Sequence, residues 1–325
     1  MSAIEVKNIS KNYYSAKSGK FAGIGENTLL GEDQTKSIST EERGISFEVK
    51  KGEIFGIIGP DGAGKTTLFR ILTTLILADS GSAAVDGFDV VNDYKEIRKR
   101  VGYMPGRFSL YQDLTVEENL NFFATVFNTT IEENYDLVKD IYQQIEPFKK
   151  RRAGKLSGGM KQKLALSCAL IHKPSVLFLD EPTTGVDPVS RKEFWGMLKK
   201  LKDQGITILV STPYMDEATL CDRIALIQNG QFLKIDTPEN IVRQYKNKLW
   251  AVQSDTMYKL LTDLRANNLT KNCFAFGDKH HLSMDNDQLT TDELKALIEK
   301  SGHKNVIVQE IEPTIEDCFM QLSQG

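Results

Sequence analysis

The stretch from Gly59 to Thr67 constrains this chain more than any other part of its sequence. It reads Gly-Pro-Asp-Gly-Ala-Gly-Lys-Thr-Thr and fits the pattern G-x-x-x-x-G-K-[ST]. An apolar, strand-like run over 54–58 precedes it, and a helix-like segment from Thr66 to about Leu77 follows it. Glycines let the backbone wrap closely around a phosphate, whose charge then meets backbone N–H groups at the positive end of a helix. The motif predicts a nucleotide site made of Gly59, Pro60, Asp61, Gly62, Ala63, Gly64, Lys65, Thr66 and Thr67.

A second apolar run, over 176–179, ends in two carboxylates, Asp180 and Glu181. Taken alone this is a weak signal, because apolar strands often end in acids, but downstream of a phosphate loop it becomes a strong one. We expect Lys65 to reach the β- and γ-phosphates of a nucleoside triphosphate, and Thr66 and Asp180 to ligate Mg²⁺. Glu181 would then be placed to orient or deprotonate the attacking water as the catalytic residue.

The chain has 325 residues, which predicts about two domains. Residues 1–238 alternate strand-like and helical patterns, typical of an α/β domain with a largely parallel sheet. Within them, residues 15–43 are polar and lack an apolar period, so we predict a flexible insertion, with a partner-binding loop as the alternative. Residues 239–325 lack phosphate-site motifs and mix both patterns, which predicts a small accessory or regulatory α+β domain.

Several element boundaries follow from local signals. Asp187-Pro188 is a good helix start, and Gly205 a good helix end. Thr115-Val-Glu-Glu118 predicts a capping box before another helix, and Asn229-Gly230 predicts the turn of a hairpin. Further predicted strands and helices cover 45–49, 206–210, 224–228, 231–235, 249–253 and 305–309 (strands), and 255–265 and 291–301 (helices).

Composition excludes several classes of protein. A formal charge of −3 gives no hint of a nucleic-acid surface, so we expect no nucleic-acid partner. No apolar run approaches the length needed to span a bilayer, and the first residues are charged, unlike a signal peptide. The four cysteines are far apart and show no metal spacing, which favours free thiols in a reducing cytoplasm.

A second glycine-containing segment, Leu156-Ser-Gly-Gly-Met-Lys-Gln162, opens a predicted helix that runs to about Ile171. Ser157 can cap this helix, and Gly158 and Gly159 leave backbone N–H groups open to an anion. One phosphate loop does not need two cradles in the same chain. We therefore expect this segment to face nucleotide held by another copy of the domain.

With these motifs in this order, the chain resembles the nucleotide-binding subunit of an ATP-binding cassette (ABC) transporter. The resemblance covers residues 1 to about 236, and Tyr214-Met-Asp-Glu217 is similar to the branch that pairs with drug- or polymer-exporting permeases. The end of the chain, 313–319, more weakly resembles that branch's accessory domain. The resemblance implies a phosphate-loop NTPase cassette with a helical subdomain, working as a head-to-tail dimer around two MgATP.

The same resemblance assigns further residues. Ser157, Gly158 and Gly159 would grip the partner's nucleotide, and Asp187 would lie across the dimer seam, although it is also a good helix cap. Tyr13 would stack on adenine. The neighbouring Tyr14 is a rival for that role, and an ordinary tyrosine at a strand end is the other alternative.

Two positions depart from the family pattern. The family has Gln after Tyr-x-Pro, where this chain has Gly106, and His after the 206–210 strand, where this chain has Pro213. In the family both side chains sense the γ-phosphate, and neither glycine nor proline supplies a side-chain donor. We expect slow hydrolysis, because removing one preorganised donor commonly costs ~10²–10³ in rate. Arg107 or Tyr214 could compensate.

The leading interpretation is an ATPase subunit of an ABC exporter of the multidrug-efflux kind, cytoplasmic and peripheral on the inner face of the cell membrane. Its expected partners are a membrane permease and a second ABC subunit, identical or different. The alternative is a partly degenerate subunit that binds ATP and completes the site of a catalytic partner. A soluble ABC ATPase acting on ribosomes or DNA is disfavoured, because such proteins carry two cassettes or long coiled coils. The sequence does not name the cargo.

Overall fold

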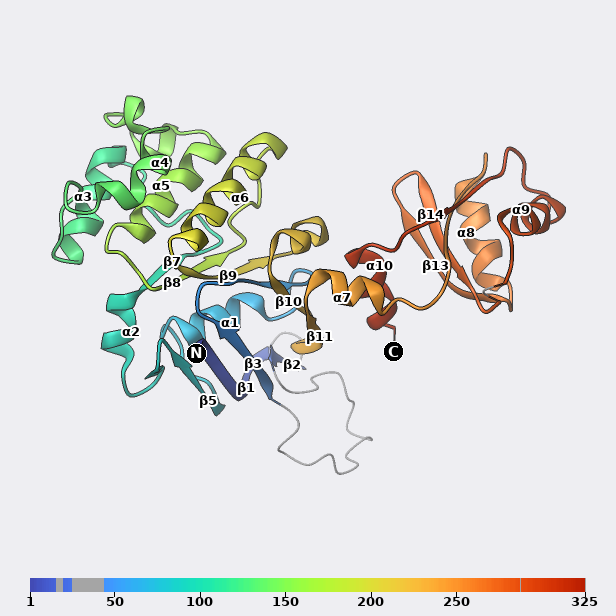
Figure 1. The fold of residues 1–325 in the computed structure, drawn as a ribbon, viewed down its shortest axis with the longest axis horizontal. Coiled ribbons are helices and arrows are strands. Elements are labelled where there is room, and N and C mark those ends of the chain that lie inside the picture. The colour runs from blue at the N-terminus through green and yellow to red at the C-terminus, as the bar shows by residue number, and fades with distance from the viewer. Residues whose placement is uncertain (16–19, 25–43, 287, 325) are drawn as a thin grey trace. The chain divides into compact units, whose positions relative to one another are not determined.

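The computed structural model describes residues 1–15, 20–24, 44–286 and 288–324. The chain forms two compact units, Met1–Thr237 and Pro238–Gly325 (Figure 1). The boundary between them falls one residue before the one expected from the sequence. Among the described residues, no helix combines the length and the apolar character that crossing a membrane requires.

Unit 1 is built on a six-stranded sheet in the order β11-β10-β4-β9-β8-β7. All neighbours in it are parallel except β10 and β11, which form the predicted hairpin around Asn229 and Gly230. The strands are β4 (Ile54–Ile58), β7 (Val101–Met104), β8 (Val176–Asp180), β9 (Thr207–Thr212), β10 (Arg223–Gln228) and β11 (Gln231–Asp236). Strands β4, β8 and β9 are buried along their whole length, which explains their continuous apolar sequences.

A second, antiparallel sheet belongs to the same unit. It contains β1 (Ser2–Ser15), β2 (Lys20–Ile24), β3 (Ile45–Lys50), β5 (Ser80–Val85) and β6 (Phe88–Asp89). Helix α1 (Lys65–Leu72) lies between this sheet and the parallel sheet (Figure 1), and one buried apolar core joins all three. The α/β class predicted from the sequence is therefore correct, and α1 is fixed from both sides.

The remaining helices of unit 1 include three that the sequence predicted, which begin after Thr115, Ser157 and Asp187, and others that it did not predict. They are α2 (Tyr94–Arg100), α3 (Val116–Val126), α4 (Tyr135–Tyr142), α5 (Gly158–Leu170) and α6 (Pro188–Asp203), with 3₁₀ helices η2 (Glu146–Phe148), η3 (Ala153–Lys155) and η4 (Met215–Leu220). Thr115 and Glu118 form the expected capping box of α3. Helices α3, α4 and α5 pack together as a helical group (Figure 1).

Two sequence-based expectations are corrected here. Helix α1 ends at Leu72 and not near Leu77, because Thr74 adopts a left-handed backbone with φ of 63° that a helix cannot continue. Within the predicted insertion, residues 20–24 form strand β2, which pairs with the end of β1. Residues 16–19 and 25–43 of that insertion lie outside the described residues.

Unit 2 contains a four-stranded antiparallel sheet in the order β13-β14-β12-β15. Its elements are α7 (Pro238–Arg243), β12 (Leu249–Gln253), α8 (Met257–Ala266), β13 (Thr270–Phe276), β14 (Lys279–Met284), α9 (Thr291–Lys300), β15 (Ile307–Ile311) and α10 (Ile315–Leu322). The run β12-α8-β13-β14-α9-β15 is the ferredoxin-like split β-α-β arrangement. Trp250 lies in its core with no exposed surface.

Candidate functional site

Four segments that carry predicted site residues leave the parallel sheet at the same edge. Strand β4 runs into the phosphate loop, β7 into Pro105-Gly106, β8 into Glu181 and β9 into Pro213. These strands are parallel, so their carboxyl ends meet at one edge, where open α/β sheets bind ligands. The fold thus gathers signals that are up to 150 residues apart in the sequence.

The phosphate loop is a tight backbone cradle around the Lys65 ammonium. Lys65 Nζ donates to the carbonyls of Gly59 at 2.8 Å and Pro60 at 3.0 Å, and its side chain is buried. Gly64, the residue before α1, has φ of 101°, which only glycine adopts without strain. A Cβ on Gly59 would collide with the carbonyl oxygen of Ile227, so this position also requires glycine. The sequence motif thus reflects two separate steric demands.

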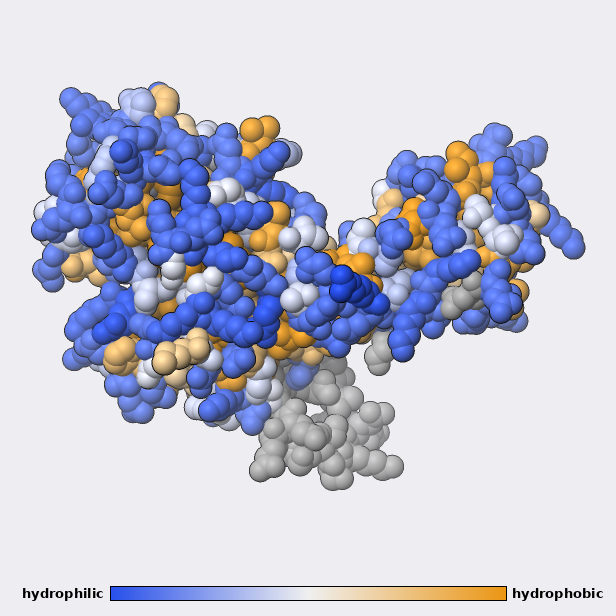
Figure 2. Space-filling model, viewed as in Figure 1, coloured by the Kyte–Doolittle hydropathy of each residue, from blue (hydrophilic) through white to orange (hydrophobic). Residues whose placement is uncertain are grey.

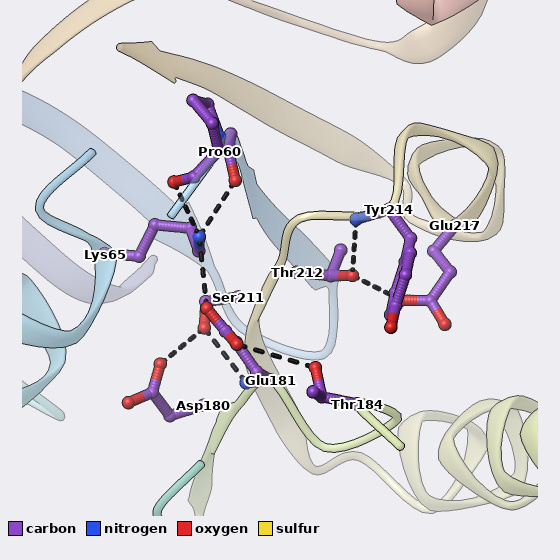
Figure 3. A network of polar contacts seen from close by, with 10 residues as sticks. Pro60, Lys65, Asp180, Glu181, Thr184, Ser211, Thr212, Tyr214 and Glu217 are labelled. Carbon is purple, nitrogen blue, oxygen red and sulfur yellow. Dashed lines mark hydrogen bonds and ion pairs between the residues drawn. The ribbon is translucent and has the colours of Figure 1, made fainter. Parts of the chain in front are cut away.

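Lys65 and Glu181 form an ion pair at the centre of the site (Figure 3), with 3.1 Å between Nζ and Oε1. Glu181 Oε2 also accepts a long hydrogen bond of 3.5 Å from the Thr184 hydroxyl. A carboxylate oxygen therefore already occupies the anion position at Lys65. The site accepts an oxyanion at this point, as a triphosphate would require.

Asp180 lies beside this pair and is held by strand β9. Its Oδ1 accepts a hydrogen bond of 2.6 Å from the Ser211 hydroxyl, and its side chain is buried. The hydroxyl of Ser211 and its carbonyl also accept from the Glu181 N–H, at 3.1 and 3.0 Å. Strand β9 thereby fixes the carboxylate of Asp180 and the backbone of Glu181. Asp180 together with Thr66, the second residue of α1, offers the hard oxygen ligands that Mg²⁺ prefers.

Glu181 has a left-handed backbone, with φ of 50°. For a residue that is not glycine this conformation is strained, at a cost of order 1–3 kcal/mol, and such strain concentrates at functional sites. The hydrogen bonds from the Glu181 N–H to Ser211 maintain it. This left-handed conformation turns the Glu181 side chain out of the strand direction and toward Lys65 (Figure 3).

Gly106, one of the two departures from the family pattern, lies directly against the carboxylates. A Cβ on this residue would be 3.1 Å from the carbonyl oxygen of Asp180 and 3.8 Å from Cβ of Glu181. Nearby, burial and the negative charge of Asp180 together raise the pKa of Tyr103 to about 12. The Tyr103 hydroxyl consequently keeps its proton beside the site at neutral pH.

The residues expected to act across a dimer lie together in this chain. Ser157 caps α5 by accepting from the Met160 N–H at 3.4 Å, and a Cβ on Gly159 would be 2.8 Å from the Ser190 hydroxyl on α6. Asp187 caps α6, and hydrogen bonds from the Ser190 and Val189 N–H groups hold the pKa of Asp187 below its usual range. Its carboxylate is therefore charged, and it performs the capping role that the sequence left open.

Tyr13 is 41% exposed on β1, and its adenine-stacking role stays a prediction. The sequence did not single out Ser211, Thr212 and Glu217 as site residues, although all three are buried beside the strand end. The sequence did contain a signal for two of them. Ser211 and Thr212 are polar residues at the end of an apolar strand, as Asp180 is.

Residues 43–184 match the family described as ABC transporter. The chain is 39% identical over 229 residues to the probable multidrug ABC transporter ATP-binding protein YbhF of Escherichia coli strain K12, covering 69% of this chain and 39% of that protein. It is 36% identical over 202 residues to the linearmycin resistance ATP-binding protein LnrL of Bacillus subtilis strain 168, covering 61% and 65%. The chain thus spans only about 39% of the length of the first relative.

Solved structures agree with this match. One described as the ATP-binding subunit of an ABC transporter superposes with a TM-score of 0.62 at 25% identity, covering 75% of this chain and 93% of that one. A dimeric bacterial ABC transporter cassette superposes with a TM-score of 0.60 at 23% identity, covering 72% and 98%, which bears on the fold alone.

Proposed function

This chain contains an ATP-binding domain of the ABC transporter family, and we propose on that premise that it is the ATP-hydrolysing subunit of an exporter. It would couple ATP-driven closure of a dimer to export by a separate permease. One observation carries the proposal: Lys65, Asp180 and Glu181 meet at the carboxyl edge of the sheet, with Lys65 and Glu181 3.1 Å apart. The names of YbhF and LnrL support a cargo of drug type.

In this proposal, some residues of the site bind the nucleotide and others act in its hydrolysis. Lys65 and the loop's backbone N–H groups hold phosphate oxygens, and Thr66 and Asp180 hold Mg²⁺, which when bound neutralises charge on the phosphates. Glu181 exchanges its ion pair with Lys65 for a role as the group that orients the attacking water and accepts its proton. Because Lys65 is buried with Glu181 as partner, nucleotide binding must replace that carboxylate with phosphate.

Calorimetry and a steady-state ATPase assay test this division directly. Lys65→Ala should lower the affinity for MgATP roughly 10²-fold or more, whereas Glu181→Gln should bind MgATP at least as tightly as the wild type and hydrolyse it far more slowly. The reason is that Glu181→Gln frees the Lys65 ammonium but removes the proton acceptor. Lys304→Ala, in unit 2, is the matched control and should change neither quantity. Wild-type turnover in the Glu181→Gln protein would refute the assigned role.

We assign a dimer seam to the patch of Ser157, Gly158, Gly159 and Asp187. The N-termini of α5 and α6 adjoin there, as the close approach of Gly159 to Ser190 requires. Two adjoining helix N-termini favour a negatively charged ligand such as the partner's nucleotide. Ser157→Arg should block ATP-dependent dimerisation of a Glu181→Gln protein in light scattering, while monomeric ATP binding persists. Dimers that form normally would contradict the assignment.

An apolar hollow in the helical group fits a permease segment. It has a volume of about 500 Å³ and is lined by residues of β7, α3 and α5, among them Met104, Phe123, Val126 and Ala169. Figure 2 shows hydrophobic residues in the region of α3 and α5 on an otherwise largely hydrophilic face. Val126 is 56% exposed, so Val126→Asp should preserve folding and ATP binding but weaken co-purification with a membrane permease co-expressed with this chain. Unchanged co-purification would exclude this surface.

A second candidate function rests on Gly106 and Pro213. A chain that lacks both γ-phosphate sensors could bind ATP and complete the site of a competent partner, with little hydrolysis of its own. A dimer assembled from this chain and its partner distinguishes the two functions. If Glu181→Gln in this chain leaves total turnover unchanged, the regulatory role is the better description.

A further inference from the structure

The segment Ser211–Tyr214 is hydrogen-bonded both to the phosphate loop and to Asp180 and Glu181 at the end of strand β8. The Thr212 carbonyl accepts from the Gly59 N–H at 3.3 Å, at the first residue of the phosphate loop. One residue earlier, Ser211 holds Asp180 and Glu181 through the hydrogen bonds described above. A displacement of this segment would therefore move the loop and both carboxylates together.

A buried carboxylate holds this segment from behind (Figure 3). Glu217 Oε2 accepts a hydrogen bond of 2.6 Å from the Thr212 hydroxyl, and the same hydroxyl accepts from the Tyr214 N–H at 3.1 Å. Thr212 and Glu217 are both fully or almost fully buried. These bonds bracket Pro213, which has no N–H of its own to donate. The hydroxyl of Thr212 is thus the point that fixes the turn.

Arg191 on α6 completes the arrangement. Its Nε lies 3.6 Å from Glu217 Oε1, and its guanidinium lies 4.0 Å above the ring of Tyr214. The Arg191 N–H also donates to the carbonyl of Asp187, one turn earlier on the same helix. Arg191 therefore connects the start of α6, where the predicted seam residue Asp187 lies, to Tyr214 and to Glu217.

From this geometry we infer that Glu217 and Arg191 are positioning residues, which act through Thr212 to hold Ser211–Tyr214 against Glu181 and Gly59. This inference rests on the proposed ATPase function. Where the family has a sensor histidine, Pro213 brings no donor, so hydrolysis at this site depends on the exact placement of Glu181. The Glu217–Thr212 bond supplies that placement.

The main test uses three threonine variants with closely similar shapes. Thr212→Val removes only the hydroxyl and should lower turnover at saturating ATP by about tenfold or more, with ATP affinity changed less than about threefold, because a hydrogen bond to a charged group is lost. Thr212→Ser restores the hydroxyl and should restore turnover. Thr207→Val is the control, since Thr207 is buried on the same strand and its hydroxyl accepts from the Gly52 N–H at 3.0 Å, at the strand's other end.

Two results would overturn the inference. One is wild-type turnover in Thr212→Val, and the other is an equal loss of binding and turnover, which would indicate general structural damage. If Thr212→Val does not fold, Glu217→Gln tests the contact with Arg191 instead at nearly constant volume, because the amide keeps an acceptor for Thr212 but loses the attraction to Arg191. Wild-type turnover in Glu217→Gln would then be the result that overturns the inference. In a double-mutant cycle of Glu217→Gln and Arg191→Met, turnover losses that simply multiply would exclude the link to α6.

Amide hydrogen exchange provides a reading that does not depend on hydrolysis. The Tyr214 N–H should be protected in the wild-type protein without nucleotide and lose protection in Thr212→Val. If the wild type hydrolyses no ATP but shows this pattern, the proposed ATPase function fails while the positioning network stands. If protection is the same in both proteins, the network itself is wrong.

Discussion

Each unit of this molecule has a close contact between a carboxylate and a nitrogen base, and the two contacts are built differently. In unit 1, Glu181 reaches Lys65 from a strained position after a strand, and 23% of its side chain is exposed. In unit 2, Asp317 bonds to His281 Nδ1 at 2.6 Å from the first turn of α10, where it also completes a capping box with Thr314. The first carboxylate can be exchanged for another anion, and the second is locked into the fold.

Sheet topology explains why the predicted site residues gather at one edge of the sheet in unit 1, and why the described sheet of unit 2 has no corresponding edge. Parallel neighbours place successive carboxyl ends at one edge, so β4, β7, β8 and β9 present their following residues together. In unit 2 every neighbour is antiparallel, so each edge mixes strand starts and strand ends. Its buried polar groups accordingly connect elements of the fold, as His281 on β14 does with Asp317 on α10.

The largest expected effect comes from removing the cation of unit 1. Lys65→Ala should lower ATP affinity roughly 10²-fold or more, because truncating one partner of a hydrogen-bonded charge costs several kcal/mol. His281→Ala, which breaks the corresponding contact of unit 2, should leave ATP affinity unchanged. Calorimetry on both proteins checks the contrast. Equal losses would mean that the units do not divide binding and architecture as described.

A smaller effect is expected from removing the carboxylate of unit 2. Asp317→Ala should lower the free energy of unfolding of unit 2 by about 1–3 kcal/mol, because a helix cap and a buried hydrogen bond are lost together. Each unit contains one tryptophan, Trp195 or Trp250, so Trp195→Phe leaves fluorescence that reports on unit 2 alone. Glu181→Gln, by contrast, should leave the stability of unit 2 unchanged, because Glu181 belongs to unit 1.

The same carboxylate gives unit 2 a defined response to acid. Burial opposes ionisation of Asp317, but hydrogen bonds from His281 and Thr314 outweigh it and hold the pKa of Asp317 below its usual value of 3.8. A depressed pKa stabilises the folded state above the unfolded pKa, and that contribution is lost as the pH falls through the folded value. Asp317→Asn should therefore flatten the decline of unit 2 stability below about pH 4. An unchanged slope would assign the decline to other groups.

An effect of about tenfold is expected from restoring both missing sensors. Gly106→Gln with Pro213→His should raise steady-state turnover and leave ATP affinity nearly unchanged, since these donors act mainly on the transition state. The increase must disappear when Glu181→Gln is added. Gly106→Ala alone measures the steric cost, because a Cβ at this position lies 3.1 Å from the Asp180 carbonyl. A double variant that is no faster than Gly106→Ala would show that the site is not limited by the missing donors.

The smallest effect should follow deletion of unit 2. A fragment of residues 1–237 should bind MgATP within about twofold of the full chain, because Lys65, Asp180 and Glu181 all belong to unit 1. An insoluble fragment would show that unit 2 covers part of the core of unit 1. A folded fragment that does not bind would remove the distinction between the two units.

The sequence predicted unit 1 well because its signals are local and steric. Gly59 and Gly64 are required by the geometry of the loop, and Asp180 and Glu181 end a strand whose burial is visible as an unbroken apolar run. The strands over 54–58 and 249–253 have the expected bounds. Strands β13 and β14 were missed, because the apolar residues along them alternate poorly.

Two contacts in and around the site could not be predicted from the sequence, and the reason is physical. The contact between Glu217 and Thr212 forms because the 3₁₀ helix η4, which contains Glu217, packs back against the end of strand β9. Among the described residues, no side chain caps η4, so the sequence carries no capping signal that would have predicted this helix. The approach of Gly159 to Ser190 joins two helices that lie about 30 residues apart. Such contacts follow from tertiary packing, which local patterns do not encode.

Because the backbone of Glu181 is left-handed, the residue that is best for stability at this position differs from the residue that is best for the proposed activity. Glycine is the residue that this backbone conformation accepts most readily, yet glycine would remove the carboxylate that we propose to be catalytic. Comparing Glu181→Gly with Glu181→Ala isolates the backbone, because both lack the carboxylate. Elsewhere glycine is the less stable of the two by roughly 0.5–1 kcal/mol, but here it should be at least as stable. At this position the most stable residue and the residue that we propose for hydrolysis are therefore different.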